Sequence, residues 1–271
     1  MHRADGGFFQ RFKSQHAERR VPRGKILAAV SGGADSVAML HALWRLRRET
    51  KREVVVAHVQ HNLRGRESER NERFVETLSE RLHLKFMSRS VSVRDFARRG
   101  KMGIEESARV LRYRALGDMA RASGARTIAV AHNANDQAET LLLNILRGTG
   151  IPGLCGMRVR RPLKDVTGRA RDARVALYRP MLAFSRDEIM AYVRSQNLKF
   201  FQDRSNRSLV HRRNWVRRKL IPLMETVQPR IVRNLVLLST YAQSERLDGD
   251  SVKRYDLSSQ RHHEETTTHR H

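Results

Sequence analysis

The chain has 271 residues, with 54 Lys and Arg against 28 Asp and Glu, which gives a formal net charge of +26. The single cysteine, Cys155, excludes an intramolecular disulfide framework and a cysteine-rich metal site. No apolar run reaches the roughly 18 residues that a membrane span requires. With 39% hydrophobic and 30% charged residues, the composition is typical of a soluble, folded protein of one or two domains.

The excess of positive charge predicts a polyanionic partner. Nucleic acid is the commonest such partner, because each Lys or Arg beside a phosphate releases a condensed counterion. The alternative is a source proteome that favours arginine, and charge alone leaves this open. The first 25 residues lack the apolar core of a secretory signal, so we expect a reduced, cytoplasmic setting.

Apolar runs and helical spacings alternate along the first half of the chain. Strands are predicted at 25–30, 54–57, 85–91 and 127–131, and helices at 37–46, 66–82, 104–123 and 135–147. This alternation predicts an α/β fold with an open, mostly parallel, Rossmann-like sheet and helices on both faces. Ligands bind such sheets at the carboxyl ends of the strands, where the turn at 31–36 is expected.

The pattern changes after Gly148. We predict a glycine-rich loop at 148–156, a mobile basic loop or hairpin at 158–174, a helix that a capping box opens at Ser185, and a helix pair at 210–225 and 229–246. The chain then divides into a basic N-terminal extension (1–23), an α/β domain (24–205), a small helical region (206–247) and a disordered, histidine-containing tail (248–271).

The turn Ser31-Gly-Gly-Ala-Asp-Ser36 is the first candidate site. Two glycines permit a close backbone approach, and serine hydroxyls and free helix amides can meet an anion there. Asp35 would repel phosphate unless a divalent cation lay between them, so it is a candidate Mg²⁺ ligand. The lysine of a Walker A loop is absent. The simpler interpretation is an ordinary strand-to-helix turn with a serine-rich cap.

The turn resembles the pyrophosphate-binding loop of the N-type ATP pyrophosphatases, the PP-loop superfamily. Other stretches narrow the resemblance to the tRNA(Ile)-lysidine synthase family: His58-Val-Gln-His-Asn-Leu-Arg64, Ala108-Arg-x-x-Arg-Tyr113, His132-Asn-Ala-Asn-Asp-Gln-Ala-Glu-Thr140, Asp203-Arg-Ser-Asn206 and Arg213-Asn-x-x-Arg217. The similarity extends over about residues 24–240. Asn135 departs from the family, which more often has a second acid there, and so does Gln60.

The resemblance implies a ligase that consumes ATP with Mg²⁺. The wobble cytidine (C34) of a CAU anticodon in tRNA(Ile) is adenylated at C2 with release of pyrophosphate, and free L-lysine then displaces AMP. The modified tRNA reads Ile instead of Met codons. Relatives often continue into a further tRNA-binding domain, and its absence would weaken discrimination between tRNAs. The oligomeric state stays open, a homodimer being one option.

The resemblance also implies roles for individual residues. The expected nucleotide-binding residues are Ser31, Gly32, Gly33, Asp35, Ser36 and His61, with Asp35 and Asp136 as metal ligands. The expected catalytic residues are Asp35, Arg112, His132, Asp136 and Glu139. Of these, His132, Asp136 and Glu139 would hold the lysine, with His132 as a possible proton acceptor. Spacings of four and three residues let these three side chains converge.

A basic run from Arg204 to Lys219 contains no acid and one tryptophan, Trp215. Such a run is either a solvated helix face or a tRNA contact, and self-repulsion favours the tRNA contact. Its expected tRNA-binding residues are Arg204, Arg207, Arg213, Arg217 and Arg218. Two further alternatives remain: a tRNA 2-thiolase on the same scaffold, which the single cysteine disfavours, and a non-catalytic RNA-binding module.

Overall fold

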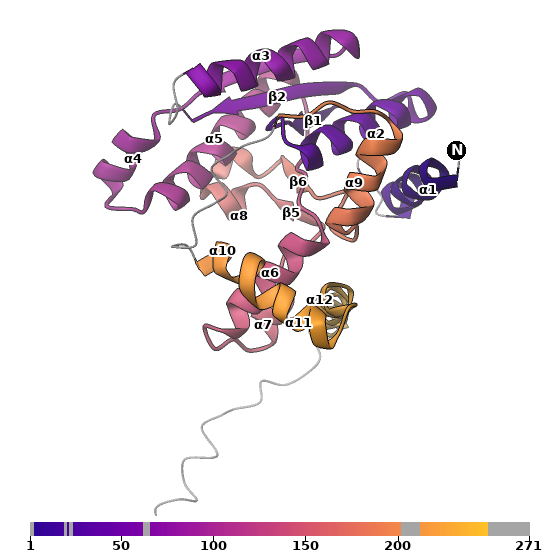
Figure 1. Cartoon of the computed structure of the whole chain (residues 1–271). Helices are drawn as coiled ribbons and strands as arrows, with labels where there is room; N and C mark the ends of the chain where they lie inside the picture. The colour runs from indigo at the N-terminus through magenta and orange to yellow at the C-terminus, as the bar shows by residue number, and fades with distance from the viewer. Residues whose placement is uncertain (1–2, 19–20, 22–23, 62–65, 202–211, 249–271) are drawn as a thin grey trace, which may run out of the picture.

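The computed structural model describes residues 3–18, 21, 24–61, 66–201 and 212–248. At its centre is a six-stranded sheet in the order β3-β2-β1-β4-β6-β5 (Figure 1). All neighbouring strands are parallel except β5 and β6, which are antiparallel. The strands are β1 Ile26–Ala29, β2 Val54–Gln60, β3 Lys85–Ser90, β4 Thr127–Ala129, β5 Arg160–Pro162 and β6 Ala176–Tyr178. The predicted open, mostly parallel α/β sheet is confirmed.

Helices follow most strands, as the sequence predicts. They are α1 Arg3–Glu18, α2 Ala34–Thr50, α3 Arg66–Arg81, α4 Val93–Gly100, α5 Ile104–Ser123, α6 Ala134–Ile145, α7 Ile151–Leu154, α8 Lys164–Thr167, α9 Arg186–Ser195, α10 Arg212–Trp215, α11 Ile221–Val227 and α12 Ile231–Asp248. Ala170–Asp172 form a 3₁₀ turn, and Val216–Leu220 form a π-helical segment between α10 and α11.

Two apolar layers cover the sheet, because successive strand residues point to opposite faces. On one face, Ile26 and Ala28 of β1 pack with the buried residues of α1, α2 and α9. On the other face, Leu27 packs against α5 through Tyr113 and Leu116. Both faces of β1 are therefore dry, as expected of a central parallel strand.

The order of the strands creates a crevice beside β1. The chain leaves β1 in the direction of β2 and β3, and then crosses to β4 on the opposite side of β1. The loops after β1 and β4 consequently diverge at the carboxyl edge of the sheet, which is where open α/β sheets bind ligands. The turn at 31–36 and the segment that begins at His132 are these two loops.

The C-terminal helices pack on α6. Figure 1 shows α10, α11 and α12 gathered around α6 and α7, below the sheet in this view. A third apolar cluster joins Leu141 and Leu142 of α6 to Val216, Ile221 and Leu235. The helix that follows β4 thus connects the sheet to the helical region. The expected boundary between those two parts, near residue 205, lies outside the described residues.

The N-terminal segment differs from the expected basic extension. Residues 3–18 form α1, and its aromatic residues Phe8, Phe9 and Phe12 are buried in the first core layer. Phe8 stacks on Tyr192 of α9 with ring centroids 4.2 Å apart. The sequence predicts a basic extension here because apolar residues are few in this stretch. Their spacing along one helix face is what places them in the core.

The basic stretch at 158–174 is ordered, and the hairpin alternative is correct. β5 and β6 form an antiparallel pair, and α8 and the 3₁₀ turn connect them. Asp172 is fully buried and accepts hydrogen bonds from Thr167 and Arg169, and Arg121 also pairs with it. Asp118 of α5 pairs with Arg169 and Arg171, so acids within and beside the basic stretch neutralise part of it and hold it against α5. The predicted loop at 148–156 contains the short helix α7.

Two predicted helices have different boundaries in the structure. The predicted helix at 210–225 consists of α10, the π-helical segment and α11, and the helix predicted at 229–246 is α12. The tail expected to be disordered lies outside the described residues from 249 onward. None of the described helices is both long and apolar enough to cross a membrane.

Candidate active site

The glycine turn is held by contacts that leave no room for a side chain. Gly32 has φ +84°, and a Cβ atom there would lie 2.0 Å from Oδ1 of Asn71 on α3. Asn71 Nδ2 donates to the carbonyl of Ser31 at 2.8 Å, and the Phe201 amide donates to the carbonyl of Gly32 at 2.9 Å. Any other residue would have a strained φ and would displace the Asn71 side chain from its hydrogen bond to Ser31, so glycine is strongly favoured here. The turn is thus pre-formed at the sheet edge.

The two serine hydroxyls of the turn lie together, as the sequence analysis expects. Ser31 Oγ and Ser36 Oγ are 3.2 Å apart, and Ser36 Oγ donates to the carbonyl of Gly33 at 2.8 Å. Ser36 is buried and also accepts from the Ser31 amide. Its hydroxyl therefore organises the turn from within, whereas Ser31 is exposed and faces outward.

Asn133 joins the two loops of the crevice. It caps α6 in a reciprocal box: Asn133 Oδ1 accepts from the Asp136 amide at 3.0 Å, and Asp136 Oδ2 accepts from the Asn133 amide at 3.1 Å. Its Nδ2 donates to Asp35 Oδ2 at 3.2 Å. Because β1 and β4 are neighbours, one buried amide side chain brings both predicted metal ligands to the same place.

Burial acts on both aspartates. Burial raises the pKa of Asp35, with the nearby Asp136 adding to the effect and Arg186 opposing it. Burial likewise raises the pKa of Asp136, while Arg213 opposes it and Glu139 adds to it. Two like charges in a partly desolvated crevice disfavour their own ionisation, and a bound cation would relieve this.

Basic groups occupy the other side of the crevice. Arg179, buried at the end of β6, donates from Nε to His132 Nδ1 at 3.0 Å and from Nη1 to the Arg158 carbonyl at 2.7 Å. Burial, and then the charges of Arg179 and Arg112, hold the pKa of His132 well below its usual value. A neutral imidazole that accepts at Nδ1 carries its hydrogen on Nε2. This arrangement disfavours the expected role of His132 as a proton acceptor.

Arg112 and His61 leave polar atoms unused. Arg112 Nε and His61 Nδ1 are buried without a hydrogen-bond partner. Burial, followed by Arg112 and His58, lowers the pKa of His61 to about 4, so its ring is neutral. Arg112 also lies over the ring of Tyr113, with 5.0 Å between the guanidinium carbon and the ring centroid. Buried polar atoms without partners are typical of positions that a ligand completes.

Arg213 and Arg217, the two arginines of the RNxxR stretch, are partly exposed and also contact the acids of α6. Arg213 Nε donates to Glu139 Oε2 at 2.8 Å, and its Nη2 donates to Asp136 Oδ1 at 3.3 Å. Arg217 binds both oxygens of Glu139 and also reaches Asp136 Oδ1 at 3.3 Å. The structure thus joins a predicted tRNA-binding pair to a predicted lysine-binding pair, which the sequence analysis kept apart.

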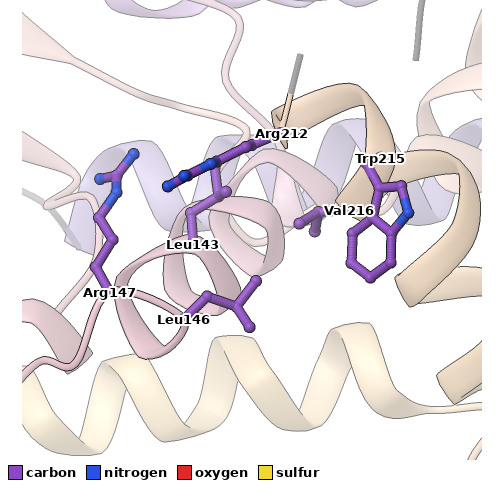
Figure 2. A pocket seen from close by; sticks show the side chains of 6 residues that line it. All are labelled: Leu143, Leu146, Arg147, Arg212, Trp215 and Val216. Carbon is purple, nitrogen blue, oxygen red and sulfur yellow. The ribbon is translucent and has the colours of Figure 1, made fainter. Parts of the chain in front are cut away.

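α10 and the π-helical segment, residues 212–220, form what we call the arginine segment. A small apolar cavity of about 90 Å³ lies beside it (Figure 2). Trp215 is half-exposed on α10, and Leu146 is exposed at the end of α6. The cavity is lined by Leu143, Leu146, Arg147, Arg212, Trp215 and Val216. In this view Arg147 and Arg212 lie to one side of Trp215, and its half-exposed ring is a surface on which an unpaired base can stack.

Most of the predicted site residues lie at the crevice. The structure brings together the glycine turn and the side chains of Asp35, His132, Asp136 and Glu139. The basic side of the crevice contains Arg112 and His61. Arg218 is exposed on the π-helical segment. Arg204 and Arg207 lie outside the described residues. Within the described part of the chain, no group of three or more His, Cys, Asp or Glu side chains could hold a metal alone.

Three residues that shape the site are not among the predicted site residues: Asn71, Asn133 and Arg179. Asn133 carried a signal, since Asn followed three residues later by an acid at a helix start resembles a capping box. Asn135, the departure from the family pattern, accepts from the Arg186 amide at 2.9 Å and so joins α6 to the start of α9. Asn71 and Arg179 act only through contacts distant in sequence, which no local pattern reveals.

The fold and the crevice together define an α/β nucleotide-binding domain whose first strand ends in a glycine turn. Comparison with known families refines this class: the chain belongs to the PP-loop domain family, which matches residues 8–224. The match includes the glycine turn, both aspartates and the RNxxR arginines.

Two curated relatives are named tRNA(Ile)-lysidine synthase. The protein from Geobacter sulfurreducens is 39% identical over 249 residues, 90% of this chain and 50% of that protein. The protein from Porphyromonas gingivalis is 40% identical over 211 residues, 78% of this chain and 43% of that protein. The chain thus spans about half the length of the curated relatives it matches.

Among solved structures, the fold is similar to the U34-tRNA thiolase NcsA from Methanococcus maripaludis, which was solved with its [4Fe-4S] cluster. The TM-score is 0.70 over 88% of this chain and 80% of that chain, at 16% sequence identity. At this identity the similarity supports the fold and says nothing about the reaction.

Proposed function

We propose that this protein ligates free L-lysine to C2 of the wobble cytidine (C34) in the CAU anticodon of tRNA(Ile), through an adenylated cytidine, with ATP converted to AMP and pyrophosphate. The observation that carries the proposal is the Asp35–Asn133–Asp136 bridge, which places two carboxylates beside a glycine turn. The names of the curated relatives supply the substrate class. The product tRNA would read Ile codons.

The glycine turn would hold the phosphates of ATP. Its backbone amides lie at the start of α2, where the helix dipole favours an anion, and Ser31 offers an exposed hydroxyl. Arg112, with an unused buried Nε, would bind a phosphate oxygen of the nucleotide, and His61 would contact the adenine from the same side. These groups would stabilise the negative charge that develops as pyrophosphate leaves.

Asp35 and Asp136 fit a Mg²⁺ ion. Mg²⁺ in nucleotide sites takes one or two carboxylates and completes its shell with phosphate oxygens and water, so two protein ligands suffice. Burial raises the pKa of both carboxylates, which is the state that a divalent cation would relieve. The ion would supply positive charge to the leaving pyrophosphate.

Glu139 and Asp136 would bind an ammonium group of lysine. Both carboxylates lie on the first turns of α6, and Glu139 is fully buried. They already pair with the guanidinium groups of Arg213 and Arg217, which supports a role in binding a cation. His132 would position Arg179 through Nδ1 and would not take the proton from lysine.

The arginine segment would contact the tRNA. Arg213, Arg217 and Arg218 lie on α10 and the π-helical segment, and Trp215 between them offers a stacking surface. Phosphate contacts by such arginines give affinity, and the aromatic ring accepts an unstacked anticodon-loop base.

Two other functions remain as alternatives. A 2-thiolase resembling the solved structure would need sulfur chemistry, and the single cysteine of this chain, Cys155, is buried and hydrogen-bonded to the Ala242 carbonyl. A non-catalytic RNA-binding module would bind tRNA without consuming ATP. The bridged aspartates favour the ligase over both.

Labelled lysine separates these functions. The protein is incubated with ¹⁴C-lysine, ATP, Mg²⁺ and a CAU-anticodon tRNA(Ile), with an elongator tRNA(Met) as the matched control. The ligase predicts label in tRNA(Ile) that requires ATP. ATP-independent tRNA binding without label would contradict it and support the module, and label without specificity for tRNA(Ile) would contradict the proposed substrate.

A further inference from the structure

The acids and the arginines that join α6 to the arginine segment differ in the exposed fraction of their side chains. The Glu139 side chain is 1% exposed and that of Asp136 is 16% exposed, whereas Arg213 is 45% and Arg217 is 30% exposed. The carboxylates are therefore fixed inside the crevice, and the guanidinium groups lie between them and solvent. An arginine can exchange its partner without a change in the fold, and the acids cannot.

We propose that RNA phosphates and the substrate ammonium group bind with positive coupling, because Arg213 and Arg217 leave Asp136 and Glu139 for phosphates as the ammonium takes their place. This inference rests on the proposed function and specifies how the lysine site of that function is controlled. Without RNA, the chain's own guanidinium groups occupy the site as competitors of the substrate.

The coupling follows from the cost of an unpaired buried charge. Buried carboxylates that lose both of their guanidinium partners are strongly destabilised, so the arginines do not leave unless other cations replace them. Phosphate binding draws the arginines outward, and an ammonium group keeps the carboxylates paired. Two guanidinium groups leave two carboxylates, and the substrate ammonium group together with the Mg²⁺ proposed at Asp136 keeps both carboxylates paired, so each ligand favours the other. Thermodynamic linkage makes the effect reciprocal.

The local backbone suits such an exchange. Both arginines flank Val216, which is 1% exposed and anchored in the apolar cluster with α6. Residues 216–220 form a π-helical segment, a conformation that is rare and occurs frequently at functional sites. With Val216 fixed, the two side chains can move to phosphates by rotation about their own bonds.

The competing interpretation is a permanent structural bridge. In that case Arg213 and Arg217 would hold α10 on α6 in every state, and the lysine would bind elsewhere or share the acids with them. The two interpretations predict opposite effects on lysine affinity when the arginines are removed, which makes the experiment decisive.

The test measures L-lysine affinity by calorimetry, with and without a saturating synthetic CAU anticodon stem-loop. We expect the stem-loop to raise the lysine affinity of the unmodified protein about tenfold, within the usual range of coupling between sites. Arg213→Met/Arg217→Met should bind lysine about tenfold more tightly without RNA and lose the response to RNA. Lys219→Met, which removes an exposed cation of the same segment, should retain the response.

Two further measurements test the same proposal if the Arg213→Met/Arg217→Met variant folds poorly. Arg213→Lys/Arg217→Lys keeps the charges but loses the guanidinium forks, so it should fold and show reduced coupling. In a Trp44→Phe background, Trp215 is the single tryptophan and reports on the segment directly. The stem-loop should change its fluorescence, and Glu139→Gln should produce part of that change without RNA.

Each outcome has a definite meaning. Equal lysine affinity with and without RNA in the unmodified protein, or weaker lysine binding by folded double variants, would overturn the exchange. If label from lysine still enters tRNA under those conditions, the proposed function stands and only the exchange fails. Lysine that neither binds nor enters tRNA in any arm would overturn both.

Discussion

Arg217 binds both carboxylate oxygens of Glu139, a fully buried residue 78 positions earlier in the chain. This fork joins the helix that follows β4 to the arginine-rich C-terminal segment. A bidentate guanidinium–carboxylate pair fixes orientation as well as distance. The crevice and the helical region are therefore one electrostatic unit, and a change in one affects the other.

Removing Arg217 should reveal the cost of leaving Glu139 unpaired. Arg217→Met is expected to lower the free energy of unfolding by about 2 kcal/mol, less than for a fully buried pair because Arg217 is partly exposed. The double variant Glu139→Gln/Arg217→Met should regain part of that loss. Urea unfolding of the single and double variants measures these changes in the free energy of unfolding. A double variant that loses the sum of the two single losses would contradict the pairing.

A side chain at Gly32 should be more costly than one at an open glycine of the same backbone conformation. Gly32→Ala combines an unfavourable positive φ with a Cβ 2.0 Å from Asn71 Oδ1, so we expect a loss of about 3 kcal/mol and of ATP binding. Gly148→Ala is the matched control, since Gly148 also has a positive φ but nothing lies within 4 Å of its Cβ. That control should cost only about 1 kcal/mol. Thermal unfolding and nucleotide titration distinguish the two; similar losses would contradict the close approach.

Asn133 should matter to the nucleotide site beyond its role as a helix cap. Asn133→Ala removes the cap of α6 and the hydrogen bond to Asp35, whereas Ser185→Ala removes an equivalent capping box from α9. Each variant should lose about 1 kcal/mol of stability. Only Asn133→Ala should also weaken Mg²⁺-dependent ATP binding, by about tenfold. Equal ATP affinity in both variants would show that Asn133 acts as a cap alone.

His16 should make the protein less stable in acid. Burial, and then Arg52, lower the pKa of His16 to about 4 in the folded protein, against about 6.5 unfolded. Between these two pKa values the unfolded chain binds more protons than the folded protein. The contribution of His16 to stability is therefore fully present above pH 6.5 and is lost as the pH is lowered toward 4. The loss attributable to His16 is on the order of 2–3 kcal/mol.

The variant His16→Gln isolates this contribution from that of other titrating groups. Its free energy of unfolding should depend less on pH between 6.5 and 4.5 than that of the unmodified protein. Chemical denaturation at a series of pH values gives the comparison. Parallel curves for the two proteins would mean that the ring is solvated and that α1 does not bury it.

The first four strands of the central sheet could be predicted because each of them carries its own local signal. Val54, Val55 and Val56 form a continuous apolar run, as a strand buried on both faces requires, and β1 and β4 show the same pattern. The glycine turn could be located because it lies between such a strand and a helix. β6 was missed because Ala176–Tyr178 is too short to show a periodicity.

The candidate site could be predicted only in its local parts. Asp35, His132, Asp136 and Glu139 lie in short motifs that follow strands, so their meeting at one edge follows from the parallel sheet. The pairing of Arg213 and Arg217 with the acids could not be predicted, because those partners are more than 70 positions apart and each stretch has a sufficient local explanation. Charge runs predict a polyanion and do not reveal an internal acid.

The most direct test of the central claim, that the glycine turn and the bridged aspartates form a nucleotide–metal site, is calorimetry of ATP binding. Titrations of the unmodified protein and of Asp35→Asn, each with Mg²⁺ and with EDTA, separate the nucleotide from the ion. The account predicts binding heat for the unmodified protein with Mg²⁺ and a loss of at least about tenfold in affinity with EDTA or with Asp35→Asn. Folded protein that shows no heat with ATP and Mg²⁺, or equal affinity in all four titrations, would contradict it.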